Sequence, residues 1–210
     1  MSVISFRHFY ATGKKVLKGV ELKDFSLEVQ PGEVVALVGE KAALPIAALM
    51  GKAKITQGEI YVGDHLLRTD KLTDYAVEAI PCDIHLGFPA KKPVILGYIK
   101  QLKKKKLPAN EIDRRVRECA MRLDISHLME RKPRALSSSQ KIRVALGAAA
   151  LKMPRVVVLE DFFGITHPDY HEALQKAFSE ATAALGLTVL FYTAQPAHAK
   201  AMGARVVEVN

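Results

Sequence analysis

Short apolar runs, separated by turn residues, occupy both ends of the chain and predict strands. Residues 20–29 alternate imperfectly between apolar and polar positions, and residues 34–38 form a continuous apolar run suited to a buried strand. Further strands are predicted at residues 59–62, 156–159, 187–192 and 205–209. Gln57-Gly58 is expected to form the turn before the first of these.

Helices are predicted at residues 45–50, 137–151 and 169–184, and an amphipathic helical subdomain, with apolar residues at helical spacing, at residues 96–129. In the first of them Pro45 takes the first helical position, where its missing N–H costs nothing, and Gly51 is the expected stop. Asn110 is a candidate N-cap in the long middle stretch. Because apolar strands alternate with helices in the C-terminal half, the chain is expected to have an α/β fold with a parallel sheet.

The loop after residues 34–38 resembles a phosphate-binding turn that has lost its phosphate chemistry. Gly39 would open the motif G-x-x-x-x-G-K-[ST], which places Gly, Lys and Ser/Thr at positions 44 to 46. The chain carries Leu44, Pro45 and Ile46 there. It therefore has no lysine for the β- and γ-phosphates, no hydroxyl for Mg²⁺ and one backbone N–H fewer. Glu40 adds a negative charge inside the loop, and Lys41 is the substitute cation available there.

Composition limits the size of the fold and the setting in which it works. The 210 residues are 49% hydrophobic, which is enough to bury the core of a single domain with a subdomain. No apolar run approaches the length of a membrane span, and the N-terminus lacks the pattern of a signal peptide. Cys82 and Cys119 have no metal-ligand spacing and are expected to be free thiols in a reducing, cytoplasmic setting.

The formal net charge is +9, and much of the excess is local. Lys103, Lys104, Lys105 and Lys106 follow one another, with Lys91-Lys92 a short distance before them. Such a patch suits an anionic surface or nucleic acid. A solvated helix end is the simpler explanation, and no aromatic residues interleave with the lysines, so nucleic acid is not the expected partner.

The order of the motifs resembles that of ATP-binding-cassette (ABC) ATPases over nearly the whole chain. Leu136, Ser137, Ser138, Ser139 and Gln140 are similar to that family's signature sequence L-S-G-G-Q, and the Arg143-Val144-Ala145 that follows is similar to its continuation. The resemblance implies an ABC ATPase-like P-loop NTPase fold with a mixed or parallel sheet core, an N-terminal β subdomain and a helical signature subdomain. One domain, residues 1–210, is expected, with about 1–80 and 152–210 as core lobe and about 85–150 as helical subdomain.

The resemblance also implies a position for each functional residue, and most are altered. The Walker A lysine and hydroxyl positions fall on Pro45 and Ile46, and the glutamine between the lobes falls near Cys82. The Walker B aspartate corresponds to Glu160 and the catalytic glutamate to Asp161, an inverted acidic pair. The remaining positions are the switch histidine at Ala194, the dimer-contacting aspartate at His167 or Asp169, and an adenine-stacking aromatic at Phe9 or Tyr10.

Three functions remain open from the sequence. The first is a catalytically inactive ABC ATPase-like subunit, a structural or regulatory part of a transporter or membrane-associated assembly, with little or no ATP binding. The second is a degenerate nucleotide-binding subunit that pairs with an active ATPase subunit, in which case ATP and Mg²⁺ would be its cofactors. The third is a basic module for anions or nucleic acid, built on the lysine cluster.

The partner expected from the resemblance is a membrane subunit or another ABC-type ATPase subunit, in a homo- or heterodimer. The location expected is cytoplasmic, on the inner face of the cell membrane. No cofactor is expected under the first function. We expect no metal site, because Pro168 lies between the two histidines with helical spacing, His167 and His171.

Overall fold

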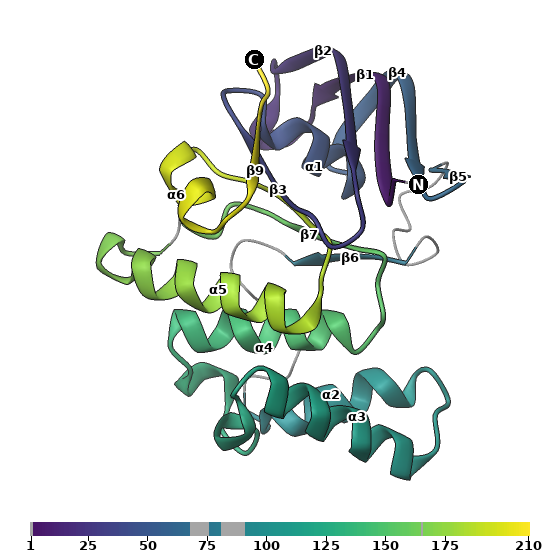
Figure 1. Ribbon diagram of the computed structural model, residues 1–210. Coiled ribbons are helices and arrows are strands. Elements are labelled where there is room, and N and C mark those ends of the chain that lie inside the picture. Colours follow the sequence, from purple (N-terminus) through teal and green to yellow (C-terminus); the bar gives the residue numbers. More distant parts are fainter. Residues whose placement is uncertain (1, 68–75, 81–90, 165) are drawn as a thin grey trace. The chain divides into compact units, whose positions relative to one another are not determined.

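The computed structural model describes the chain except residues 1, 68–75, 81–90 and 165 (Figure 1). Contacts between residues divide it into two units. The first comprises residues 1–82, 155–164 and 187–210, and the second comprises residues 83–154 and 165–186. Residues 165–186, expected from the sequence in the core lobe, group here with the helical unit. Within the described residues, no helix is long and apolar enough to cross a membrane.

The first unit contains two sheets. An antiparallel sheet has the order β2-β1-β4-β5, and a five-stranded sheet has the order β6-β7-β8-β3-β9 with every pair parallel. The strands of the antiparallel sheet are β1 (Ile4–Gly13), β2 (Glu21–Val29), β4 (Ala53–Val62) and β5 (His65–Leu66). Those of the parallel sheet are β3 (Val34–Val38), β6 (Val77–Ile80), β7 (Val156–Leu159), β8 (Val189–Tyr192) and β9 (Arg205–Glu208).

The helices of the first unit are short. They are η1 (Lys15–Leu17), α1 (Ala43–Leu49) and α6 (Pro196–Ala201). Figure 1 shows α1 beside the strands of the antiparallel sheet, and it contacts β1 and β4 of that sheet and β8 of the parallel one. Its side chains join one apolar core with residues of both sheets, which include Phe6, Val35, Ile60 and Val158. The buried apolar runs of β3 and β7 are those of central parallel strands.

The second unit is helical. Its elements are α2 (Val94–Lys103), α3 (Ala109–Arg122), η3 (Ser126–Leu128), η4 (Pro133–Ala135), α4 (Ser138–Ala150), η5 (Pro168–Tyr170) and α5 (His171–Leu185). The buried side chains of α3 include Ile112, Val116 and Cys119, as the helical spacing predicts. The Tyr98 hydroxyl of α2 is fully buried and donates a hydrogen bond to the Val144 carbonyl of α4 at 2.8 Å. This bond links α2 to the signature helix.

Three local predictions are wrong. Pro45 occupies the third position of α1, not the first, and is tolerated because the first four N–H groups of a helix lack helical partners anyway. The N-cap of α3 is Pro108, not Asn110. Gln57-Gly58 lies inside β4, where the pairing with β1 is irregular and Gly58 has φ +80°. A Cβ at Gly58 would lie 1.9 Å from the His8 carbonyl oxygen, so glycine allows the two strands to approach here.

Candidate functional site

The altered motif positions of the first unit meet at one edge of the parallel sheet. Leu37 of β3 pairs with Tyr192 of β8, and Phe191 of β8 pairs with Leu159 of β7. Because these strands are parallel and in near register, the loops after them emerge at the same carboxyl edge, where ligands of open α/β sheets bind. The loop after β3 carries Gly39, the loop after β7 carries Glu160, and the loop after β8 carries Ala194.

The loop after β3 is short, and the chain itself accepts hydrogen bonds from several of its amides. Gly39 has φ +111°, and a Cβ there would lie 2.6 Å from the Val209 carbonyl oxygen, so the position requires glycine. The Lys41 N–H donates to that same Val209 carbonyl at 3.2 Å, and the Ala42 N–H donates to the Gly39 carbonyl at 3.2 Å. The Leu44 N–H donates to the Lys41 carbonyl at 2.9 Å. Amides held in this way are not directed at a phosphate.

The start of α1 is apolar and buried. Leu44 and Ile46 have no exposed surface, Pro45 is buried between them, and all three precede further buried positions of the same helix. Glu40 is exposed and Lys41 is half-buried in the preceding loop. At the two positions where a phosphate-binding loop places a lysine and a hydroxyl, this chain therefore presents side chains to its own core.

The acidic residue directly after β7 has a cationic partner within the chain. The Lys52 ammonium group forms an ion pair with the Glu160 carboxylate, whose side chain is 15% exposed. Gly51, with φ +69°, follows α1 and turns the backbone, and Lys52 comes directly before β4. Sequence reasoning missed this pair because 108 residues separate its members and no motif marks the lysine.

The second acidic residue of the pair is turned towards its own loop. The Asp161 Oδ1 atom accepts hydrogen bonds from the Phe163 N–H at 3.0 Å and from the Gly164 N–H at 3.3 Å. Such a bond fixes the loop conformation in the manner of an Asx turn. The carboxylate of Asp161 thus supports the chain after β7, and it is one methylene shorter than the glutamate expected at this position.

The loop after β8 offers no titratable side chain at the switch position. Ala194 is exposed, and the buried Thr193 hydroxyl before it accepts a hydrogen bond from the Gln195 N–H at 3.3 Å. The nearest histidine along the chain is His198 in α6, which is buried. Its ring packs against Phe163 with 4.3 Å between ring centroids.

The signature residues begin α4 in the second unit. Ser137 is the N-cap, and its hydroxyl accepts a hydrogen bond from the Gln140 N–H at 3.3 Å. The Gln140 Oε1 atom accepts one from the Ser137 N–H at 3.1 Å, which completes a capping box. The Ser139 hydroxyl lies 3.1 Å from that of Ser137, Ser138 is half-buried, and Leu136 is buried. In this structure Ser137 and Gln140 therefore form the N-terminal cap of α4.

Other predicted residues fall in different places. Phe9 is fully buried, with its ring edge-on to Phe6 at 5.3 Å, so it belongs to the core. Tyr10 is half-buried. The glutamine position at Cys82 lies outside the described residues. In the part of the chain that the structure describes, His171 contacts the Thr166 carbonyl at 2.8 Å and His167 contacts Asp169 at 3.4 Å.

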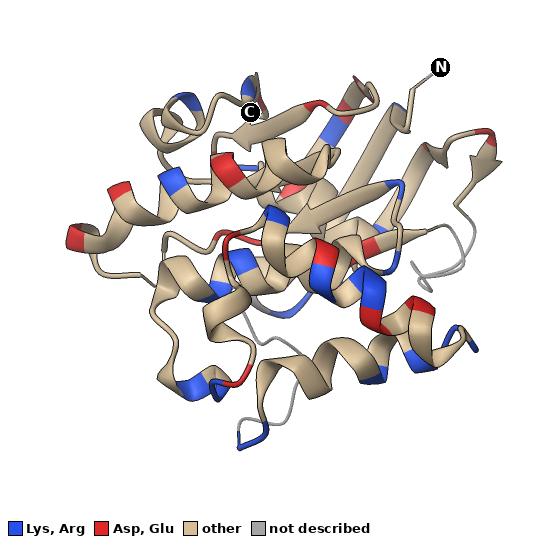
Figure 2. Cartoon of the chain, turned by 60° about the horizontal axis from the view of Figure 1, so that its bottom comes forward, with Lys and Arg blue, Asp and Glu red and all other residues tan. Residues whose placement is uncertain are grey.

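The lysine cluster lies at and beyond the C-terminus of α2. Lys103 is the last helical residue, Lys104 is the C-cap, and all four side chains are exposed. The Lys105 ammonium group donates to the Lys152 carbonyl. Cations at this end complement the helix dipole. Residues 94–106 contain five lysines and no Asp or Glu, whereas α3 carries basic and acidic residues side by side (Figure 2).

Comparison with known proteins agrees with this arrangement of elements. A family model described as ABC transporter matches residues 22–163. A trehalose/maltose import ATP-binding protein of Thermococcus litoralis is 31% identical over 197 residues, which cover 90% of this chain and 53% of that protein. An sn-glycerol-3-phosphate import ATP-binding protein of Brucella abortus is 31% identical over 215 residues, with 97% and 57% covered. The chain thus spans a little over half the length of these curated relatives.

Solved structures show the same fold. The protein cbiO1 from Clostridium perfringens, part of an ABC transporter complex, superposes with a TM-score of 0.76 at 21% identity, over 92% of this chain and 79% of that one. A dimeric ATP-binding cassette bound to ADP and Pi gives a TM-score of 0.68 at 19% identity, with 99% and 94% covered. The chain has the ABC ATPase-like P-loop NTPase fold, and it belongs to the ABC transporter family.

Proposed function

We propose that this chain is a non-hydrolysing ATP-binding-cassette subunit, which serves as a structural or regulatory part of a transporter assembly at the inner face of the membrane. The observation that carries the proposal is the burial of Leu44, Pro45 and Ile46. Its proposed partner is a membrane subunit or a second ATPase subunit, as the names of its relatives suggest for a transport system.

The residues at the carboxyl edge of the sheet do not fit Mg·ATP. The triphosphate lacks a lysine, the metal lacks a hydroxyl ligand, and the carboxylate of Glu160 is already balanced by the Lys52 ammonium group. Metal binding by Glu160 would first require breaking this partly buried ion pair, which costs free energy. A functional Mg·ATP site has its carboxylate available without that cost. Asp161 would also have to leave the Phe163 and Gly164 amides before it could orient a water molecule.

Phosphate release tests the absence of hydrolysis. We expect the purified chain to release phosphate from Mg·ATP at the same background rate as its Asp161→Asn variant. Asp161 is the matched position because its carboxylate is the nearest counterpart of a catalytic base. A rate that falls on this substitution would show that the chain hydrolyses ATP itself, and the proposal would then be wrong.

A second function is favoured by the state of the signature residues. Ser137 and Gln140 keep the residue types of the family motif, and Ser137 is exposed at the start of α4. Such a helix start could meet the phosphates held by another subunit, which would make this chain the degenerate half of a pair. The addition of this chain should then raise the ATPase rate of that partner.

The two functions separate in one mixing experiment. If the chain completes a partner's site, Ser137→Arg should abolish the stimulation, whereas Ser126→Arg at an exposed serine of η3 should leave it intact. If the chain is a scaffold alone, it should join the assembly with no change in the partner's ATPase rate, and both variants should behave as the unmodified chain does.

A further inference from the structure

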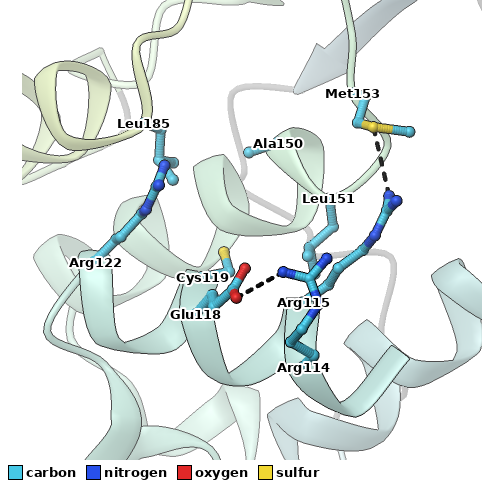
Figure 3. Close-up of a pocket in the computed structure, with 9 residues that line it drawn as sticks. All are labelled: Arg114, Arg115, Glu118, Cys119, Arg122, Ala150, Leu151, Met153 and Leu185. Carbon is cyan, nitrogen blue, oxygen red and sulfur yellow. Dashed lines mark hydrogen bonds and ion pairs between the residues drawn. The ribbon is translucent and has the colours of Figure 1, made fainter. Parts of the chain in front are cut away.

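A pocket of about 330 Å³ lies in the helical unit, between α3 and the C-terminal ends of α4 and α5 (Figure 3). This volume is at the lower end of the range for small-molecule sites. An α-helix with its side chains is about 10–12 Å across and would not enter it. None of the motif positions discussed above lines the pocket. The pocket is therefore distinct from the nucleotide site.

One of the three guanidinium groups in the lining is already satisfied. The Arg114 Nε and Nη2 atoms each donate to the Glu111 carboxylate at 2.9 Å, and its Nη1 atom donates to Glu118 at 2.7 Å. Glu118 is the acidic residue of the lining, and Arg114 balances its charge. These two residues therefore add little net attraction for a ligand.

The other two guanidinium groups retain donors. Arg115 uses Nε on Glu111 at 2.6 Å, but its Nη1 atom faces the Met153 thioether at 3.4 Å, which is a weak acceptor. Arg122 has no hydrogen bond or ion pair to any part of the chain that the structure describes. Figure 3 shows Arg115 and Arg122 on either side of Cys119. The lining thus holds two flanking cations with free donors.

The wall between these cations is apolar. Leu151 and Cys119 are buried, Leu185 is half-buried, and Met153 is 60% exposed at the rim. Burial raises the pKa of the Cys119 thiol to about 11, against the opposing charge of Arg122, so the thiol stays protonated and neutral at physiological pH. A neutral buried thiol packs as a small apolar group.

We propose that this pocket binds a small organic anion, a carboxylate carried on an apolar body of several carbons. The carboxylate would accept hydrogen bonds from Arg122, since charge-assisted guanidinium–carboxylate bonds are among the strongest in proteins. Arg115 lies seven residues earlier on α3, at the other end of the lining, and would add attraction as a more distant charge. The apolar body would cover Leu151 and Cys119. Neither the carboxylate nor the apolar body alone should bind tightly. A carboxylate alone must displace the water around the arginines, and the apolar wall is too small to hold an apolar body by itself.

Titration calorimetry of the full chain with octanoate tests the proposal. We expect saturable binding with a dissociation constant below about 1 mM. Acetate lacks the apolar body and 1-octanol lacks the charge, so each should bind at least about tenfold more weakly than octanoate. An absence of octanoate binding up to about 10 mM, or equal binding of 1-octanol, would overturn the proposal.

Variants locate the binding within the chain. Arg122→Gln should weaken octanoate binding by about tenfold or more, whereas Arg115→Gln, which removes the more distant charge, should weaken it by about twofold to threefold. Arg117→Gln is the matched control, because Arg117 lies on α3 outside the lining, is 74% exposed and pairs with Asp113 at 2.9 Å. Circular dichroism should show each variant folded. Octanoate binding that is unchanged in Arg122→Gln would contradict the assigned site.

Discussion

Ile46→Ser places a hydroxyl at the position where a working phosphate loop has one. In such a site the serine would contact metal and water, and the substitution should restore a favourable group. In this chain Ile46 has no exposed surface and packs into the core between the two sheets of its unit. The substitution should therefore cost stability and bring no gain in nucleotide affinity.

The magnitude follows from the burial of the side chain. Truncation of a fully buried isoleucine typically costs about 2–5 kcal/mol, including the cavity left behind. A buried hydroxyl adds a desolvation cost of about 1–3 kcal/mol, part of which is recovered if it bonds to the carbonyl four residues earlier in the helix. We expect a loss of about 3–5 kcal/mol in the free energy of unfolding, against about 5–15 kcal/mol for a whole domain.

Urea denaturation, followed by circular dichroism, measures this loss. Ile55→Ser is the matched control, since Ile55 lies in β4 and is 37% exposed, and it should cost about 1 kcal/mol or less. A loss below about 1 kcal/mol for Ile46→Ser would refute the reasoning, because the side chain would then not be part of the core.

Three further substitutions test other parts of the account. Gly147→Ala should lower the midpoint of urea unfolding by the equivalent of about 1–2 kcal/mol, because its Cβ would lie 2.4 Å from the buried Tyr98 hydroxyl; a stabilised variant would contradict this packing. Ser137→Ala should cost about 1 kcal/mol through loss of the N-cap, whereas Ser137→Asp should be nearly neutral. The Arg205 guanidinium lowers the pKa of Glu33 below its ordinary 4.5, so the pair stabilises the fold above pH 4.5 and less as the pH falls through the lowered value. Arg205→Met should thus be up to about 1 kcal/mol less stable at pH 7, and the difference should vanish in acid; a constant difference would contradict the ion-pair origin.

The sequence predicted the fold well because the signals were local and strong. The apolar runs of β3 and β7 and the helical spacing of α3 specify their elements without reference to the rest of the chain. The failure at Gly58 has a physical reason, since glycine permits both a turn and an irregular strand, and only the approach of β1 selects between them.

The candidate site could be predicted in part. The absence of the phosphate-loop lysine and hydroxyl could be predicted, because the motif places them at a fixed spacing from Gly39. The ion pair between Lys52 and Glu160 was not, because it depends on where the end of α1 meets the end of β7. The pocket beside Arg122 also escaped prediction, since charged residues on the exposed face of a helix carry no sign of the cavity next to them.

The central claim is that the buried side chains of Leu44, Pro45 and Ile46 prevent nucleotide binding. Calorimetric titration with Mg·ATP tests it most directly. The account predicts no saturable heat up to about 500 μM Mg·ATP, for the native chain and for Lys52→Met alike. Lys52→Met frees the Glu160 carboxylate from its ion pair. If this variant also fails to bind Mg·ATP, the closed start of α1, and not the ion pair, prevents binding. A dissociation constant of about 10 μM or lower in the native chain would contradict the account.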